Sequence, residues 1–252
     1  MSDENELLKK RFTELAGKSR VCGYFLFTDF LGLNELSVFN DAVRPLMPLC
    51  YKTFGGASGA ERVMVRFGDE SELGYDAPFP ISCIKIEPLM QKFADKLTHR
   101  DFLGALLNLG IERSVLGDIV IRENVGYVFA KEDIAEYICQ ELNRVKRTAV
   151  KASVCQDLPT GELYKLEDKT VQLSGERLDA VIAKLFSLSR EDSTLLFRKK
   201  LVFVGGKCVE NNDYRPKEND LVSVRGYGRF IYCGAYSTSK KGKLNVLTKL
   251  YV

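Results

Sequence analysis

The sequence of 252 residues contains no tryptophan and a single histidine, His99. Nucleophilic triads need a His beside a Ser or Cys, and zinc sites need His and Cys at suitable spacings. One histidine, together with cysteines that never form a C-x-x-C pair, does not supply such a set. We therefore predict no metal, no cofactor and no catalytic residue, which favours a binding protein over an enzyme.

Long apolar runs are also missing. The longest hydrophobic stretches are far shorter than the roughly 20 residues that a bilayer-spanning helix needs. The first ten residues, MSDENELLKK, are charged and lack the apolar stretch of a signal peptide. These features predict no membrane insertion and a cytoplasmic location.

The cysteines are scattered along the chain and odd in number. Such a set is typical of reduced thiols in the core, because a disulfide framework needs paired residues. The seven positions are Cys22, Cys50, Cys83, Cys139, Cys155, Cys208 and Cys233.

The net charge of +3 hides an asymmetry between the two ends of the chain. Residues 174–252 hold 15 Lys or Arg and 8 Asp or Glu, whereas the remainder holds 22 and 26. Positive charge concentrated in one segment indicates a polyanionic partner. RNA, an acidic protein and a membrane surface all fit this pattern.

Residue patterns predict an α+β protein with three parts. Residues 1–78 form a small α/β region that opens with a helix ended by Gly17. Residues 79–158 are expected to follow the order β-α-β-β-α-β of a ferredoxin-like or RRM-like domain, with a helix over 92–110 closed by Gly110 and a hairpin turn at Glu123–Asn124. A boundary is expected near Pro159 and Gly161.

The last domain, residues 172–252, is predicted to contain two short helices followed by a basic β-hairpin. Ser174 is expected to cap the first helix, and Ser189, with Asp192 three residues later, the second. Arg177 and Arg190 then lie at helix starts, where phosphates bind. The residues predicted to bind RNA are Arg177, Asp179, Ser189, Arg190, Arg198, Lys199, Lys200, Lys207, Arg225 and Arg229.

Several of these motifs resemble a known module, the alpha-L RNA-binding domain named after ribosomal protein S-four. The resemblance rests on Arg177-Leu178-Asp179, Ser189-Arg190, the turn at 204–207 (VGGK) and the segment 217–224 (KENDLVSV). Members of that family usually have V-N-G-K at the turn and a glycine at the position of Asn219. Because Gly and Asn both accept turn conformations, the same fold is expected.

Motifs further upstream resemble the YlmH family of bacterial proteins that carry this module. They are HRDFLGA at 99–105, LGIER at 109–113, LGDI at 116–119, and Gly55-Gly56 followed by Ala60-Glu61-Arg62. The resemblance implies a cytoplasmic factor that binds structured ribosomal RNA or tRNA. It also implies association with the large ribosomal subunit and with rescue of stalled subunits that carry peptidyl-tRNA, and for some members a link to cell division.

Three sharper interpretations were weighed against these. The His99-Arg100-Asp101 triplet lacks the Asn that a kinase catalytic loop needs five residues after its Asp. The glycine-rich stretch 55–60 lacks the ending of a P-loop, but it could approach RNA beside Arg62. Aromatic residues in 126–129 (GYVF) resemble the strand on which RRM proteins stack bases, but the strand 81–86 (ISCIKI) supplies no matching aromatic, so ordinary core and hairpin packing is the favoured interpretation. Arg62, His99 and Arg100 are therefore candidates for a secondary RNA contact.

The sequence thus predicts a non-catalytic protein that grips structured rRNA or tRNA, with RNA and the large ribosomal subunit as partners. Two other function classes stay open. One is an RNA-modifying enzyme whose centre lies within residues 1–158. The other is a cell-division adaptor whose basic domain docks on an acidic protein or a membrane. The oligomeric state is not predicted.

Overall fold

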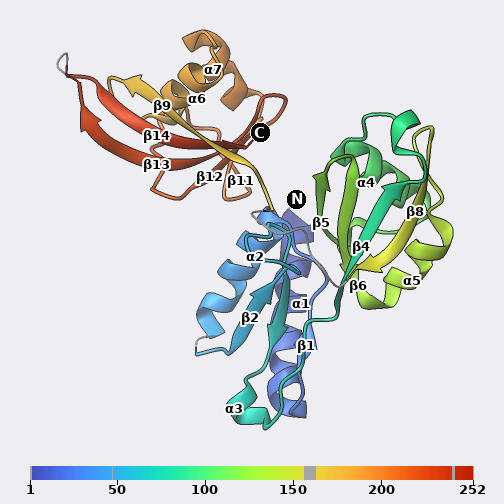
Figure 1. Cartoon of the computed structure of the whole chain (residues 1–252). Helices are drawn as coiled ribbons and strands as arrows, with labels where there is room; N and C mark the ends of the chain where they lie inside the picture. Colours follow the sequence, from blue (N-terminus) through green and yellow to red (C-terminus); the bar gives the residue numbers. More distant parts are fainter. Residues whose placement is uncertain (1, 47, 156–162, 240–241, 252) are drawn as a thin grey trace. The chain divides into compact units, whose positions relative to one another are not determined.

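The computed structural model describes residues 2–46, 48–155, 163–239 and 242–251. It divides into two compact units, residues 1–163 and 164–252, shown in Figure 1. Helices and strands are mixed in both units, as predicted for an α+β protein. The predicted boundary near Pro159 and Gly161 lies outside the described residues.

The first part of unit one places two helices against a small sheet. Helices α1 (Ser2–Cys22) and α2 (Leu33–Val43) accompany strands β1 (Leu26–Phe27), β2 (Tyr51–Phe54) and β3 (Met64–Phe67), in the antiparallel order β1-β3-β2. Short helical turns follow α2 at Arg44–Leu46 and β3 at Glu70–Leu73. The buried rings of Phe12, Phe39 and Phe67 form the centre of this core, with the first two 5.3 Å apart.

The first helix is longer than the sequence predicted. It continues through Gly17 and ends at Cys22. A Cβ on Gly17 would have no neighbouring atom within 4 Å, so this glycine is not needed for close packing. Gly23 follows with a φ of 68°, the left-handed conformation that commonly ends a helix. The prediction that Gly17 ends the helix was therefore wrong, because an isolated glycine weakens a helix without stopping it.

The second part of unit one has the predicted order of elements. These are β4 (Ile81–Pro88), α4 (His99–Asn108), β5 (Leu116–Arg122), β6 (Val125–Lys131), α5 (Glu132–Glu141), β7 (Arg144–Val145) and β8 (Thr148–Cys155). Their antiparallel sheet has the order β5-β6-β4-β8-β7. Short 3-10 turns occur at Gln91–Phe93 and Arg113–Val115.

Two local predictions in this part have different outcomes. The hairpin turn at Glu123–Asn124 is confirmed, and both residues have the positive φ angles, 48° and 67°, of a tight hairpin turn. The helix expected over 92–110 begins only at His99, so the predicted start was wrong. Thr98 ends the preceding loop by forming a capping box with Asp101, so the residues before it stay outside the helix.

Alternation along the strands gives the central sheet two different faces. Ile84 and Val128 pair with each other and face the core under α4 and α5. Phe129 lies on the opposite face but is only 1% exposed. A Cβ on Gly56 would lie 2.2 Å from its ring, so the glycine-rich loop packs directly on it. Phe129 therefore packs inside the protein, as preferred for this strand over base stacking.

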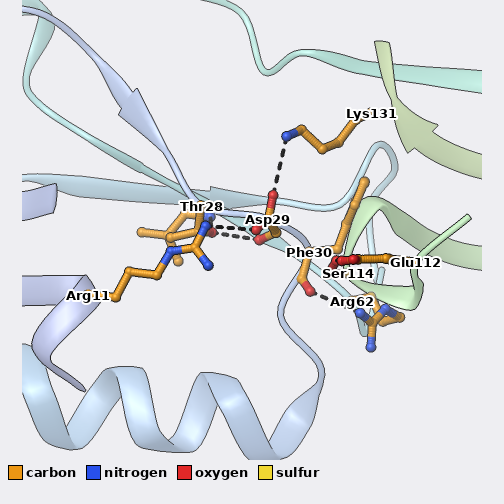
Figure 2. A network of polar contacts seen from close by, with 9 residues as sticks. Arg11, Thr28, Asp29, Phe30, Arg62, Glu112, Ser114 and Lys131 are labelled. Atoms are coloured by element: carbon orange, nitrogen blue, oxygen red, sulfur yellow. Dashed lines mark hydrogen bonds and ion pairs between the residues drawn. The ribbon is translucent and has the colours of Figure 1, made fainter. Parts of the chain in front are cut away.

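Polar contacts also join the first part of unit one to the second (Figure 2). Asp29, which follows β1, accepts hydrogen bonds from Arg11 of α1 at 2.9 Å and from Lys131 of β6 at 3.2 Å. The Phe30 amide donates to the Ser114 carbonyl at 2.8 Å. The two hydrophobic cores are separate, but these bonds and the glycine loop hold them in one compact unit.

Unit two is a six-stranded antiparallel sheet with two helices on one face (Figure 1). Its elements are β9 (Leu166–Leu173), α6 (Leu178–Leu185), α7 (Arg190–Arg198), β10 (Val202–Val204), β11 (Lys207–Cys208), β12 (Leu221–Val224), β13 (Gly228–Thr238) and β14 (Leu244–Tyr251). The strand order is β11-β10-β12-β13-β14-β9. Because β9 pairs along its whole length with β14, the unit begins before residue 172, where the last domain was expected.

The cysteines are free, as predicted, but only some are in the core. Cys83 is buried on β4, where burial raises the pKa of its thiol to about 12. Cys22, Cys50 and Cys208 are exposed, so the prediction of core thiols was wrong for them.

Candidate nucleic-acid interface

A basic groove lies beside the two helices of unit two. Its volume is about 720 Å³, and β9, the turn after it, α6, the α6–α7 turn, the start of α7 and the residue before β14 contribute to its wall. The described residues that line it include four bases and no acid. They are Gln172, Leu173, Ser174, Gly175, Arg177, Ala180, Ala183, Lys184, Ser187, Leu188, Arg190 and Lys243.

Three of the four bases point their charge toward solvent. Lys184, Arg190 and Lys243 are exposed, and none of them forms an ion pair within the described parts of the chain. Small residues, Gly175 and Ala180 among them, leave room between these side chains. The groove can therefore bring several cations to one polyanion.

Arg177, the fourth base, is held by two carboxylates. Its guanidinium makes two hydrogen bonds to Asp179, at 3.0 and 2.7 Å, and an ion pair with Asp213 at 2.6 Å. Hydrogen bonding to Asp179 raises the pKa of Arg177. The side chain is 34% exposed. Its charge is largely compensated, and its position is fixed.

Asp179 is 2% exposed, so it cannot form a broad contact with RNA. Besides its bonds to Arg177, its carboxylate accepts a hydrogen bond from the Ala180 amide at 2.8 Å. Its backbone carbonyl accepts one from the buried hydroxyl of Ser193, on α7, at 2.7 Å. Asp179 thus orients Arg177 and links the two helices.

Ser189 has the predicted role as a helix cap. Its hydroxyl oxygen accepts a hydrogen bond from the Asp192 amide at 3.0 Å, while its hydroxyl donates to the Asp192 carboxylate at 2.6 Å. The Ser189 hydroxyl thus makes both of its hydrogen bonds to Asp192. Its role is to cap α7 next to Arg190.

Ser174 does not cap the first helix, which is a correction. Helix α6 starts at Leu178, with Arg177 at the cap position. The Leu178 amide donates to the Tyr214 carbonyl at 2.8 Å, which satisfies it without a side-chain cap. The preceding Glu176 accepts a hydrogen bond from Tyr232, and burial raises the pKa of that tyrosine. These contacts hold Arg177 in an extended backbone conformation, so the helix starts only at Leu178.

The remaining predicted bases of unit two lie outside the groove. Arg198, Lys199 and Lys200 are at the opposite end of α7 from Arg190. Lys200 forms an ion pair with Glu210 at 3.0 Å. Lys207 follows the turn after β10, and Arg225 and Arg229 stack on Phe203 and Tyr251, at 4.5 and 4.8 Å from the ring centres. Sequence reasoning missed Lys184 and Lys243, which the fold brings to the groove.

The turns that depart from the S-four pattern have the expected geometry. Gly205 and Gly206 have φ angles of 53° and 81°, and Asn219 has one of 69°. All three are left-handed, a conformation that Gly adopts freely and Asn more readily than most residues. The substitutions therefore preserve the turns.

The secondary candidates lie in unit one and have different surroundings. The Arg62 guanidinium donates to the carbonyls of Leu116, Phe30 and Arg113, at 2.9, 2.9 and 3.2 Å, and desolvation lowers its pKa. Arg62 therefore joins two parts of the fold (Figure 2) and does not offer its charge to RNA. His99 and Arg100 are exposed at the start of α4.

Among the described residues, no group of three or more His, Cys, Asp or Glu is arranged to hold a metal ion. Among the helices described, none is both long and apolar enough to cross a bilayer.

Comparisons with known proteins cover most of the chain. A solved structure, "Cell division protein ylmH from Streptococcus pneumoniae", superposes on 62% of this chain and 93% of its own, with a TM-score of 0.49 and 22% sequence identity. A curated relative, "Ribosome-associated protein quality control protein P2" of Bacillus subtilis (strain 168), is 30% identical over 226 residues. That match covers 87% of this chain and 84% of the relative.

The second part of unit one also matches a family model. Residues 76–157 correspond to the domain described as "Putative RNA-binding domain in YlmH". This match does not include the S-four-like motifs, which begin at Arg177. It therefore supports the family resemblance independently of those motifs. Together with the similarity over nearly the whole curated relative, it shows that the chain belongs to the YlmH family of RNA-binding proteins.

Proposed function

We propose that the chain is a ribosome-associated, non-catalytic RNA-binding factor. It grips structured rRNA or tRNA through unit two and works in the cytoplasm on the large ribosomal subunit, in rescue or quality control of stalled translation. The name of the Bacillus subtilis relative supports the ribosomal setting. In this proposal residues 1–78 and 79–158 act as two domains that position the gripping end.

The observation that carries the proposal is the groove of unit two. It combines Arg177, fixed by Asp179, with the exposed charges of Lys184, Arg190 and Lys243. Arg190 is the first residue of α7, where the amide groups and the positive end of the helix dipole also favour anions. A backbone phosphate near this helix start would contact a guanidinium and amide donors together.

Co-sedimentation with purified ribosomal subunits tests the proposal. We expect the full chain to pellet with large subunits at low salt and to be released as salt is raised. Contacts of the three exposed cations with three phosphates would give a slope of about −2 to −3 in a plot of log affinity against log salt concentration. Equal binding to small subunits contradicts the large-subunit assignment. Binding that is independent of salt contradicts phosphate recognition itself.

A further inference from the structure

Three large apolar side chains project into solvent from the segment that joins β4 to α4. Leu89, Met90 and Phe93 are 63%, 68% and 79% exposed. Exposed apolar clusters on a folded domain commonly mark interaction sites, because such surface gains free energy when it is covered. The segment lies at the end of the central sheet where β4 stops and β8 begins.

This segment is held on both sides by hydrogen bonds, so its apolar side chains are presented by a fixed backbone. On one side, the Leu89 amide donates to the Ala149 carbonyl and the Asp95 amide to the Thr148 hydroxyl, both at 3.0 Å. On the other side, the Leu97 amide donates to the Asn124 side chain at 2.7 Å. A surface that is ordered before binding loses less entropy when a ligand arrives.

The surroundings of the apolar cluster are basic. Residues 89–100 and the neighbouring hairpin segment 143–149 hold six Lys or Arg and one Asp, with Glu123 in the adjacent turn. The exposed bases with no ion pair within the described ranges are Lys92, Lys96, Arg100, Arg144 and Arg147. Lys92 lies over the ring of Phe93, with its nitrogen 6.0 Å from the ring centre. Cations around an exposed aromatic ring are the chemistry of sites for single-stranded nucleic acid.

The open face of the central sheet is partly covered by contacts within the protein. The glycine-rich loop covers Phe129. Lys85 is paired with Glu87 at 2.7 Å, and Arg122 donates to the Leu163 carbonyl at 3.3 Å. The face on which an RRM stacks bases is thus partly used by the protein itself, whereas the three large apolar side chains at the end of the sheet are exposed.

We propose that this end of the central domain binds unpaired RNA nucleotides. A base stacks on Phe93 against Met90 and Leu89, and the flanking phosphates contact Lys92 and Lys96. The assignment rests on the proposed RNA-binding function and adds a second contact of a different kind. Unit two holds phosphates of structured RNA, whereas this surface takes an adjoining single strand.

The test uses the full chain and two labelled RNA hairpins with the same stem, one blunt and one with about eight unpaired nucleotides, a length typical of single-strand sites. We expect the tail to raise the affinity of the natural protein about tenfold, which corresponds to 1.4 kcal/mol. Met90→Ser combined with Phe93→Ser should remove this gain and leave the affinity for the blunt hairpin unchanged. Leu107→Ser, at an exposed leucine of α4, is the matched control and should keep the gain.

A second pair of variants separates specific phosphate contacts from net charge. Lys92→Glu combined with Lys96→Glu should lower the gain from the tail more than Lys10→Glu combined with Lys18→Glu, which changes two exposed lysines of α1. Equal effects of the two pairs overturn the proposal, as does a tail that adds nothing for the natural protein.

The outcomes also distinguish this surface from the function on which it rests. Normal binding of the blunt hairpin without a gain from the tail rejects the second contact and leaves the groove standing. Failure to bind either hairpin rejects both. Phe93-dependent retention on phosphatidylglycerol vesicles, without any gain from the RNA tail, assigns the surface to a lipid and overturns the proposal.

Discussion

At the scale of single residues, the four bases of the unit two groove differ in what holds them. Arg177 is fixed by two carboxylates, one of them buried, and so contributes geometry more than free charge. Lys184, Arg190 and Lys243 keep their full charge at the surface. This division matters for mutagenesis, because a change at Arg177 disturbs the fold around Asp179 as well as any RNA contact.

The exposed bases allow a cleaner experiment. Lys184→Glu combined with Arg190→Glu should weaken binding of an RNA hairpin at least about tenfold, because two phosphate contacts become repulsions. The melting temperature should change little, since both side chains are exposed and unpaired within the described residues. Filter binding and thermal unfolding measure the two quantities.

Lys199→Glu combined with Lys217→Glu provides the control, because it makes the same change in net charge outside the groove. An equal loss of affinity in this pair would indicate that only the overall charge of the domain matters. An unchanged affinity in the Lys184 and Arg190 pair would show that RNA uses another face.

Residue chemistry explains what the sequence could predict about this site. Arg177 and Arg190 were found because each starts a helix in a recognisable motif. Lys184 and Lys243 belong to no motif, and only the packing of α6 beside β9 and β14 brings them together. The buried state of Asp179 was equally hidden, because a charged side chain is expected at the surface unless its partner is known.

At the scale of elements, the glycine-rich loop 55–60 acts as a packing device between two parts of unit one. Gly56 has a φ of 97° and lies so close to Phe129 that no side chain fits. Gly117 of β5 is also crowded, since its Cβ would lie 2.9 Å from the Cβ of Phe129. A glycine stands at position 56 because the backbone there lies directly against Phe129, and phosphate binding is not needed to explain it.

This packing predicts a difference between two glycines in one loop. Gly56→Ala should lower the free energy of unfolding of unit one by about 3 kcal/mol, from backbone strain and the clash with Phe129. Gly59→Ala should cost only about 1 kcal/mol, because Gly59 has a similar φ of 79° but nothing within 4 Å of its Cβ position. Urea unfolding of the full chain measures both, and equal losses would show that the contact with Phe129 does not matter.

Elements were more predictable than their ends. Hydrophobic periodicity and turn residues predicted the β-α-β-β-α-β order and the turn at Glu123–Asn124, because these depend on local sequence. The ends depended on contacts between distant residues. The start of α6 is set by the Tyr214 carbonyl, and nothing near Ser174 in the sequence reveals that contact.

At the scale of the whole molecule, the two units differ in charge. Residues 164–252 hold 17 Lys or Arg and 10 Asp or Glu, whereas residues 1–163 hold 20 and 24. Each unit also has its own hydrophobic core. The asymmetry visible in the sequence therefore follows a structural division, and the attraction to polyanions is concentrated in one unit.

We expect residues 164–252 to fold as an isolated fragment, because the core of unit two is built from this segment alone. The fragment should unfold cooperatively on heating and should bind a blunt RNA hairpin with the salt dependence of the full chain. Circular dichroism and binding titrations at several salt concentrations measure this. A fragment without a cooperative transition would contradict the independence of the unit, and a shallower salt dependence would indicate phosphate contacts in unit one.

The groove in unit two has walls contributed by β9, by α6 and α7, and by the residue before β14, which are separated by many residues in the chain. An unfolded chain keeps the same lysines and arginines but cannot gather them around one stretch of phosphates. RNA therefore has a higher affinity for the native state than for the denatured state. By mass action, the ligand becomes a stabiliser of the domain that holds it, so that the RNA occupancy of this factor also governs its resistance to unfolding and proteolysis.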